Sequence, residues 1–274
     1  MPVAPLPDEF WRIVESFMPS PKTNPKGGRP RSPDRACLAG IIFVLRTGIP
    51  WEMLPQELGC GSGMTCWRRL RDWQEAGIWQ LIHFAILDWL ARSERIDWSR
   101  AVVDGSSIRA VFWGQKTGPN PTDRAKPGSK RHLICDGHGI PLAIRLTGAN
   151  LNDSQLALAL VDAIPPLQGV RGRPRHRPDC VLGDRGYDAK SIRQGLRDRG
   201  ILPLLAMRNI KHGSGLGRWR WVVERTFAWL NQFRRLRVRY EKRADIHEAL
   251  LALGCVLICW KFLTRYDSTV VGAV

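Results

Sequence analysis

The chain has 274 residues, of which 44% are hydrophobic and 24% are charged. These fractions are close to the averages of globular proteins, so they exclude intrinsic disorder for the bulk of the chain. The 42 lysines and arginines outnumber the 25 aspartates and glutamates, which gives a formal net charge of +17. An excess of this size indicates a polyanionic partner, most often nucleic acid.

The seven cysteines follow no disulfide framework, and the first residues lack the charged and apolar regions of a signal peptide. The longest apolar stretch, 249–260, is shorter than the roughly 18–20 residues that cross a bilayer. We therefore expect a protein of the reducing cytoplasm, associated with the nucleoid, with no membrane contact.

The first 96 residues are predicted to be helical. Helical spacing of apolar residues predicts helices over 6–17 and 35–47, with Asp34 as the cap of the second and Gly48 at its end. Residues 19–33 between them form a basic linker rich in proline and glycine. A short helix from Pro50, a glycine-rich turn and a basic helix over 64–75 have the outline of a helix-turn-helix, followed by a helix over 78–92. A dimerisation bundle is the alternative for this region.

Residues 97–274 are predicted to form an α/β unit, and we place the domain boundary near residue 97. Strands are expected at 101–103, 131–135, 141–146, 180–183 and 201–205, and helices at 154–164, 189–199, 218–237 and 246–264. The first predicted strands follow one another directly, and the later ones alternate with helices. This order of elements favours a mixed sheet.

Three acidic residues are candidates for chemistry. Asp104 and Asp184 each end an apolar strand, and Glu224 lies on a helix between apolar residues. Carboxylates at the carboxyl ends of neighbouring strands face the crevice where open α/β sheets bind ligands. They repel one another, and a divalent cation such as Mg²⁺ or Mn²⁺ removes that repulsion.

Each of these acids also has a structural interpretation. Asp104 and Asp184 could be turn residues, because aspartate and glycine often end strands. Glu224 could pair with Arg220 or Arg225 on its own helix. The main rival of Asp184 is Asp188, which we predict to be the cap of the next helix.

Five segments, in this order, resemble the DDE transposases of bacterial insertion sequences: 27–31, 45–51, 103–110, 184–188 and 222–230. The resemblance extends from about residue 6 to about residue 263. It is closest to the short subgroup with a helical N-terminal region. It implies a ribonuclease-H-like mixed sheet flanked by helices, preceded by an all-α, helix-turn-helix-like region over 1–96, with the catalytic domain over 97–274.

The resemblance implies that Asp104, Asp184 and Glu224 are catalytic and hold two Mg²⁺ or Mn²⁺ ions, with Asp104 bridging both. Two such ions activate water or a DNA 3′-hydroxyl and stabilise the leaving oxygen. The implied enzyme is a transposase that cleaves DNA at transposon ends and transfers the 3′-hydroxyl into target DNA. Its expected partners are the terminal inverted repeats, the target DNA and further copies of itself, as a homodimer or larger oligomer.

Two alternatives use the same sequence features. A plain metal-dependent nuclease would need the same three acids, and a decayed or repurposed transposase would bind DNA without catalysis. The chain also departs from the family around Glu224. Arg220 matches the family pattern, but Gly217 and Asn231 stand where many relatives have tyrosine and lysine. Arg234 or Arg235 would have to take the role of that lysine.

The candidate DNA contacts come from four basic segments. The segments 28–31 and 171–175 resemble AT-hook cores, which lie in the minor groove, although each could be a solvated loop. The second is expected near the catalytic crevice because it precedes the Asp184 strand. The basic helix over 64–75 and a helical pattern from 218 to 243 supply the others, with Arg220, Glu224, Asn231 and Arg235 expected on one face. The predicted DNA-binding residues are Arg29, Arg31, Arg68, Arg69, Arg71, Arg173, Arg175, Arg220, Arg234 and Arg235.

Overall fold

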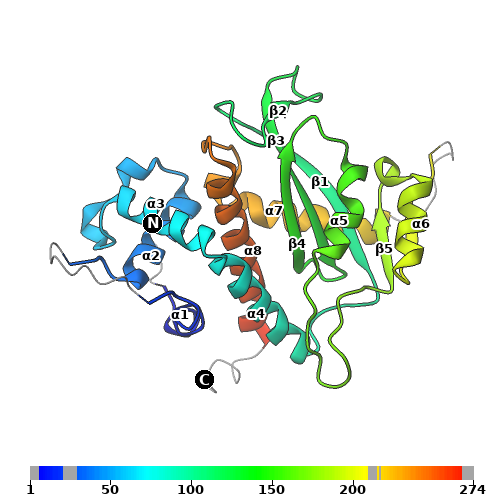
Figure 1. Ribbon diagram of the computed structural model, residues 1–274, viewed down its shortest axis with the longest axis horizontal. Coiled ribbons are helices and arrows are strands. Elements are labelled where there is room, and N and C mark those ends of the chain that lie inside the picture. Colours follow the sequence, from blue (N-terminus) through cyan, green and yellow to red (C-terminus); the bar gives the residue numbers. More distant parts are fainter. Residues whose placement is uncertain (1–5, 21–29, 209–214, 216, 267–274) are drawn as a thin grey trace.

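The structure is a computed structural model that describes residues 6–20, 30–208, 215 and 217–266 (Figure 1). The N-terminal part is helical, as predicted. It contains α1 (Asp8–Glu15), α2 (Asp34–Thr47), the 3₁₀ turns η1 (Trp51–Met53) and η2 (Gln56–Leu58), α3 (Gly63–Glu75) and α4 (Ile78–Arg92).

Local sequence explains where these helices begin and end. Gly48 ends α2 in the left-handed conformation, with φ of 76°, which glycine adopts without steric cost. Ser62 caps α3 by accepting a hydrogen bond from the Thr65 amide. The predicted cap of α2 is wrong, because Pro33 occupies the cap position and Asp34 is the first helical residue.

A six-stranded sheet forms the centre of the rest of the chain. Its strands are β1 (Ala101–Arg109), β2 (Gly118–Pro119), β3 (Pro127–Asp136), β4 (Pro141–Gly148), β5 (Cys180–Gly183) and β6 (Leu202–Leu205). The order is β2-β3-β1-β5-β6, and β4 also pairs with β3. Pairing is antiparallel from β1 through β3 to β4 and parallel from β1 through β5 to β6. The predicted mixed sheet is confirmed.

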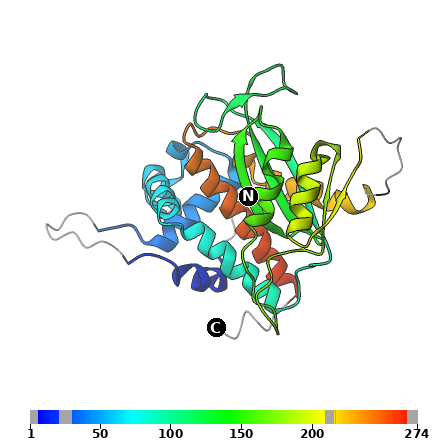
Figure 2. The same cartoon turned by 45° about the vertical axis from the view of Figure 1, so that its right-hand side comes forward.

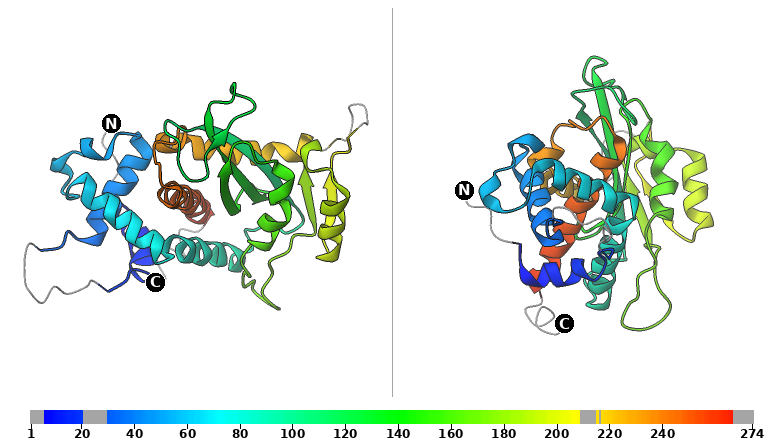
Figure 3. Two further views of the ribbon diagram at one scale, coloured as in Figure 1. Left: turned by 45° about the horizontal axis from the view of Figure 1, so that its top comes forward. Right: turned by 60° about the vertical axis from the view of Figure 1, so that its left-hand side comes forward.

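Helices cover both faces of this sheet. One face carries η3 (Asp153–Leu156), α5 (Ala157–Asp162), η4 (Arg185–Tyr187) and α6 (Lys190–Asp198), and the other carries α7 (Gly217–Gln232), η5 (Arg234–Leu236) and α8 (Ala244–Tyr266). Figure 3 shows the sheet between the two layers. This arrangement confirms the predicted mixed sheet flanked by helices.

The helix α7 is shorter than predicted. Phe233 leaves the helical conformation, with ψ of 101°, and its ring is buried near Gly254 of α8. The predicted helix to residue 237 is therefore wrong, and residues beyond Gln232 do not continue the face that carries Arg220 and Glu224.

The helix α8 connects the N-terminal helices with the sheet. It packs against α3 and α4 on one side and against β4 on the other (Figure 2). By length and composition it is the one helix of the described residues that could span a membrane, but 78% of its apolar window is buried within the molecule. It therefore serves as the central core helix. The core continues across residue 97, and the domain boundary there stays a prediction.

Candidate active site

The register of two parallel strands sets Asp104 beside Asp184. The pair Ala101 and Val181 lies side by side in β1 and β5, and each aspartate is three residues beyond its member of that pair. Both side chains therefore lie at one level of the sheet and on one face. Asp104 lies within β1, which continues to Arg109, so the prediction that it ends its strand is wrong. Asp184 does end β5.

The electrostatic surroundings of Asp104 disfavour its ionised form. Its half-buried carboxylate accepts one hydrogen bond, from the Gly105 amide at 2.8 Å. Burial raises the pKa of Asp104 to about 6; the negative charges of Asp184 and Asp153 add to that effect and the Arg220 guanidinium opposes it. Asp184 also accepts a hydrogen bond from the Gly186 amide at 2.8 Å, so it has the turn role as well.

Glu224 lies on α7, which packs across β1 and β3. Arg220 is four residues earlier, so both side chains share a helix face. The positive charge of Arg220 lowers the pKa of Asp104. The Glu224 side chain is exposed and forms no hydrogen bond or ion pair with another described residue. Among the described residues, no three acidic, histidine or cysteine side chains gather closely enough to hold a metal ion. The structure thus brings Asp104 and Asp184 together and leaves Glu224 outside their immediate contact.

A third aspartate, which the sequence analysis missed, stands beside this pair. Asp153 begins η3, and its carboxylate lies 3.1 Å from the Lys130 ammonium of β3. A β-carbon at position 105 would overlap this carboxylate, so Asp153 lies directly over Gly105. The only local signal was the Asn152–Asp153 turn after β4, which equally fits a loop without function.

The hydroxyl of Tyr187 completes the polar surroundings of the acids. Tyr187 is fully buried, and its oxygen has no hydrogen-bond partner among the described residues. Burial raises the pKa of Tyr187, and the charges of Asp153, Asp104 and Asp184 raise it further. The carboxylates of Asp104 and Asp184 are hard oxygen donors, the type that Mg²⁺ and Mn²⁺ prefer, but among the described residues no third acid lies close enough to complete a metal site.

Most arginines predicted on the N-terminal DNA surface have protein partners. Arg31 and Arg69 both contact Asp34, at 2.7 and 3.1 Å. Arg71 pairs with Asp72 at 2.7 Å. Arg68 is exposed on α3 and forms no ion pair with another described residue. Arg29 lies outside the described residues.

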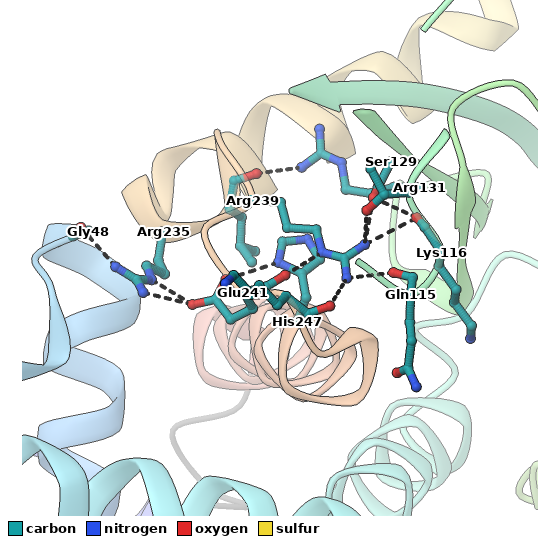
Figure 4. A network of polar contacts seen from close by, with 12 residues as sticks. Gly48, Gln115, Lys116, Ser129, Arg131, Arg235, Arg239, Glu241 and His247 are labelled. Atoms are coloured by element: carbon teal, nitrogen blue, oxygen red, sulfur yellow. Dashed lines mark hydrogen bonds and ion pairs between the residues drawn. The ribbon is translucent and has the colours of Figure 1, made fainter. Parts of the chain in front are cut away.

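The prediction that Arg235 contacts DNA is wrong, because its guanidinium is buried. It pairs with Glu241 at 2.8 Å (Figure 4) and donates a hydrogen bond to the carbonyl of Ile49 at 3.0 Å. Sequence reasoning placed it on the exposed face because it extended α7 past Phe233. Arg234 is exposed, and Asn231 accepts a hydrogen bond from the buried Arg131 at 3.1 Å.

Arg235 belongs to a buried network around Arg239 (Figure 4). The Arg239 side chain donates to carbonyl oxygens of two different segments and to the Ser129 hydroxyl at 2.7 Å. The accepting carbonyls are those of Gln115, Lys116, Glu241 and Lys242. His247 lies 3.6 Å from Glu241, and burial lowers the pKa of His247. The network ties β3 and the end of α2 to the segment before α8.

The second AT-hook-like segment lies at the wrong end of the sheet for the predicted position. Its loop leads into the amino end of β5, whereas Asp184 follows the carboxyl end. Arg175 stacks on Trp98, which precedes β1, with 5.3 Å between guanidinium and ring centroid. Arg173 is exposed. A loop that precedes a strand enters at its amino end, so Arg173 and Arg175 are not beside the acids.

Comparison with known proteins defines the class to which this fold and its paired aspartates belong. Residues 98–259 match the family described as transposase DDE domain, and residues 6–83 match a putative transposase of the IS4/5 family. The chain belongs to the DDE transposase family, whose members use divalent metal ions.

Two proteins of Burkholderia cepacia are similar to particular parts of the chain. The putative transposase for insertion sequence element IS402 is 62% identical over 57% of this chain and 75% of its own length. A 16.2 kDa protein of insertion element IS402 is 52% identical over 42% of this chain and 80% of its own length. Among solved structures, the Mos1 strand transfer complex has 12% identity and a TM-score of 0.33, over 90% of this chain and 84% of that one. This likeness is too distant to carry an argument about the site.

Proposed function

We propose that this chain is the transposase of an insertion sequence, which cleaves DNA at the transposon ends and joins the freed 3′-hydroxyl to target DNA. The observation that carries the proposal is the register of β1 and β5, which sets Asp104 and Asp184 side by side. The name of the IS402 relative supports an insertion sequence as the element that is moved. The net charge of +17 supports DNA as the partner.

Asp104, Asp184 and Glu224 are proposed as the ligands of two Mg²⁺ or Mn²⁺ ions. When bound, such ions supply a nucleophilic oxygen and stabilise the leaving oxygen at phosphorus. The register that places Asp104 beside Asp184 supports this assignment. Glu224 needs a change of side-chain conformation to join them. It is free to make that change because it is exposed and no described residue holds it.

The chain's own residues position the DNA strand and balance charge. Arg220 lies on the face of α7 that carries Glu224, where its guanidinium offsets the negative charge of Asp104 and can contact a phosphate. Lys130 neutralises Asp153 on the other side of Gly105. We assign further phosphate contacts to the exposed Arg68 and Arg234. Arg31, Arg69 and Arg71 are assigned the same role, in which each would exchange its aspartate partner for a phosphate.

The remaining parts of the proposal concern assembly. Residues 1–96 would recognise terminal inverted repeats, and residues 97–274 would perform the chemistry. The active form would be a homodimer or larger oligomer in the cytoplasm, associated with the nucleoid. This assembly predicts a complex in which each subunit binds one DNA end and two ends are held together. Gel filtration should show it as a single species.

The test uses Asp104→Asn, Asp184→Asn and Glu224→Gln with a plasmid that carries the element's ends and Mg²⁺. Each variant should lose at least about 10³-fold in cleavage rate, which corresponds to about 4 kcal/mol of transition-state stabilisation, while DNA binding persists. Asp188→Asn is the matched control, because Asp188 pairs with Arg193 and the Arg208 amide away from the acids.

The outcomes separate the candidate functions. A triad variant that still cleaves loses its assigned role. Cleavage without joined products would make the protein a plain nuclease. Binding without cleavage by the unmodified protein would make it a non-catalytic DNA-binding protein.

A further inference from the structure

The basic loop before β5 is held at its base as a hairpin. Leu167 and Arg175 exchange two backbone hydrogen bonds, of 2.9 and 2.8 Å, in an isolated antiparallel bridge. The Gln168 amide donates to Asp88 of α4 at 2.7 Å, and the Gln168 side chain donates to the carbonyl of Gly172 at 3.2 Å. These contacts fix both ends of the loop to the body of the protein.

Arg175 belongs to this base rather than to the binding tip. Its guanidinium stacks on Trp98 and pairs with Asp179. The Asp179 amide in turn donates to the carbonyl of Trp98 at 2.8 Å. Arg175 therefore stabilises the base of the loop. It could bind DNA only if it lost its contacts with Trp98 and Asp179.

The tip between the two ends projects into solvent. Val170 is 61% exposed, and Arg171, Gly172, Arg173 and Pro174 are all exposed. Gly172 has φ of 89°, a conformation that a side chain would disfavour. Neither Arg171 nor Arg173 forms an ion pair with another described residue. Two unpaired guanidinium groups therefore stand on a narrow, rigidly anchored projection.

The tip borders a depression of about 720 Å³ whose wall includes Ile96, Trp98, Arg171, Arg173 and Arg175. Glu94 is the one acidic residue of its lining. A surface with three arginines and one carboxylate favours an anion over a cation or an apolar segment. The loop also projects from the end of the sheet (Figure 1), which leaves it accessible to a duplex.

The position of the loop separates it from the acids. It lies at the amino end of β5, beside Trp98 at the amino end of β1. Asp184 is five residues beyond Asp179, a span of about 17 Å along β5. A B-form major groove is about 12 Å wide, so one groove cannot meet both features at once. DNA at the tip must be a different stretch from the DNA that is cut.

We propose that residues 169–174 form a second DNA contact, in which Arg171 and Arg173 enter the minor groove of an A·T-rich duplex away from the cleavage point. The segment Arg171-Gly172-Arg173-Pro174 is narrow, and the narrow minor groove of A·T-rich DNA concentrates the negative potential that attracts arginine. The inference rests on the proposed function to the extent that the ligand is DNA.

The test compares binding of the full chain to two duplexes without transposon-end sequence, one with an A·T tract and one G·C-rich, by fluorescence anisotropy. The double variant Arg171→Ala/Arg173→Ala should weaken A·T binding by about 10-fold and G·C binding by no more than about threefold. The matched control is Arg12→Ala/Arg197→Ala, which removes the same charge from exposed positions of α1 and α6 and should weaken both duplexes equally. A cleavage assay at saturating DNA should show a rate within about twofold of the unmodified protein.

The outcomes distinguish this inference from the proposed function. Unchanged A·T binding in the tip variant, or an equal loss on both duplexes, overturns the minor-groove contact and leaves the transposase proposal intact. A loss of the saturated cleavage rate contradicts the separation of the tip from the acids. Failure of the unmodified chain to bind either duplex overturns the minor-groove contact, and the cleavage test on the transposon ends then decides the proposed function separately.

Discussion

Two clusters of charged residues in this protein differ in how completely they are paired. The acidic cluster, defined by Asp104, Asp153 and Asp184, collects like charges, and among the described residues only Asp153 has an ion-pair partner, Lys130. The buried network around Arg239 and Glu241 collects opposite charges and carbonyl oxygens, and all three guanidinium nitrogens of Arg239 donate hydrogen bonds. Both clusters join segments that are distant in sequence.

The difference indicates what each cluster does for the fold. Buried charge that is paired and hydrogen-bonded is costly to disrupt, because removal of one partner leaves the other uncompensated. Carboxylates held together without full compensation raise the free energy of the folded protein, and such groups concentrate at functional sites. The network should therefore stabilise the protein, and the acidic cluster should destabilise it until a cation binds. Mutations in the two clusters should change stability with opposite signs.

The largest expected change in stability is at Arg239. Arg239→Ala removes a fully buried guanidinium and leaves the carbonyl groups of Gln115, Lys116, Glu241 and Lys242 without this donor, so the free energy of unfolding should fall by about 3–5 kcal/mol. Urea unfolding measures this change. The control is Arg234→Ala, an exposed neighbour that should shift stability by less than about 0.5 kcal/mol. Similar small effects for both variants would remove the distinction between the two clusters.

The next prediction concerns the pH dependence of the metal-free protein. The folded-state pKa of Asp104 is about 6, above its ordinary value of 3.8, so the folded state binds this proton more tightly than the unfolded state. Stability relative to Asp104→Asn should therefore fall as pH rises from about 4 to about 6. At pH 7 the variant should be more stable by about 1–3 kcal/mol, a difference that vanishes near pH 4.

Asp188 provides the opposite sign for the same measurement. The Arg208 amide and Arg193 hold the pKa of Asp188 below its ordinary value. Its ionised form stabilises the fold, and that contribution is lost as pH falls through the depressed pKa. Asp188→Asn should thus destabilise the protein at neutral pH. If both asparagine variants shift stability in the same direction, the assigned difference between these two aspartates is incorrect.

The smallest expected effect is on DNA binding by α3. Arg68→Ala removes an exposed guanidinium without a protein partner, so affinity should fall by a few-fold and the log–log salt slope by about one. Arg69→Ala, whose guanidinium is held by Asp34, should change the slope less and lower stability slightly. Equal changes in the salt slope for the two variants would show that Arg69 contacts DNA despite its ion pair with Asp34.

The sequence predicted the mixed sheet, most of the helices and the pairing of Asp104 with Asp184, because apolar periodicity and parallel strands carry that information locally. It did not predict the burial of Arg235, because nothing near Phe233 other than its tertiary packing ends α7. Asp153 was missed for a related reason. An Asn-Asp pair is typical of an ordinary turn, and only the tertiary contact with Lys130 of β3 distinguishes it. The predicted position of the loop with Arg173 is wrong because a loop that precedes β5 in sequence lies at the amino end of the strand, whereas Asp184 lies at the carboxyl end. The role of Glu224 stays a prediction.

The close approach of Asp153 to Gly105 has a consequence for the evolution of this fold. A side chain at position 105 would occupy the space of the carboxylate, so a substitution there requires the Asp153 side chain to move or to be replaced. Among distant relatives, alanine or serine at position 105 should occur only together with a shorter or displaced residue at position 153. Covariation of these two positions would then identify the members of the family that share this arrangement.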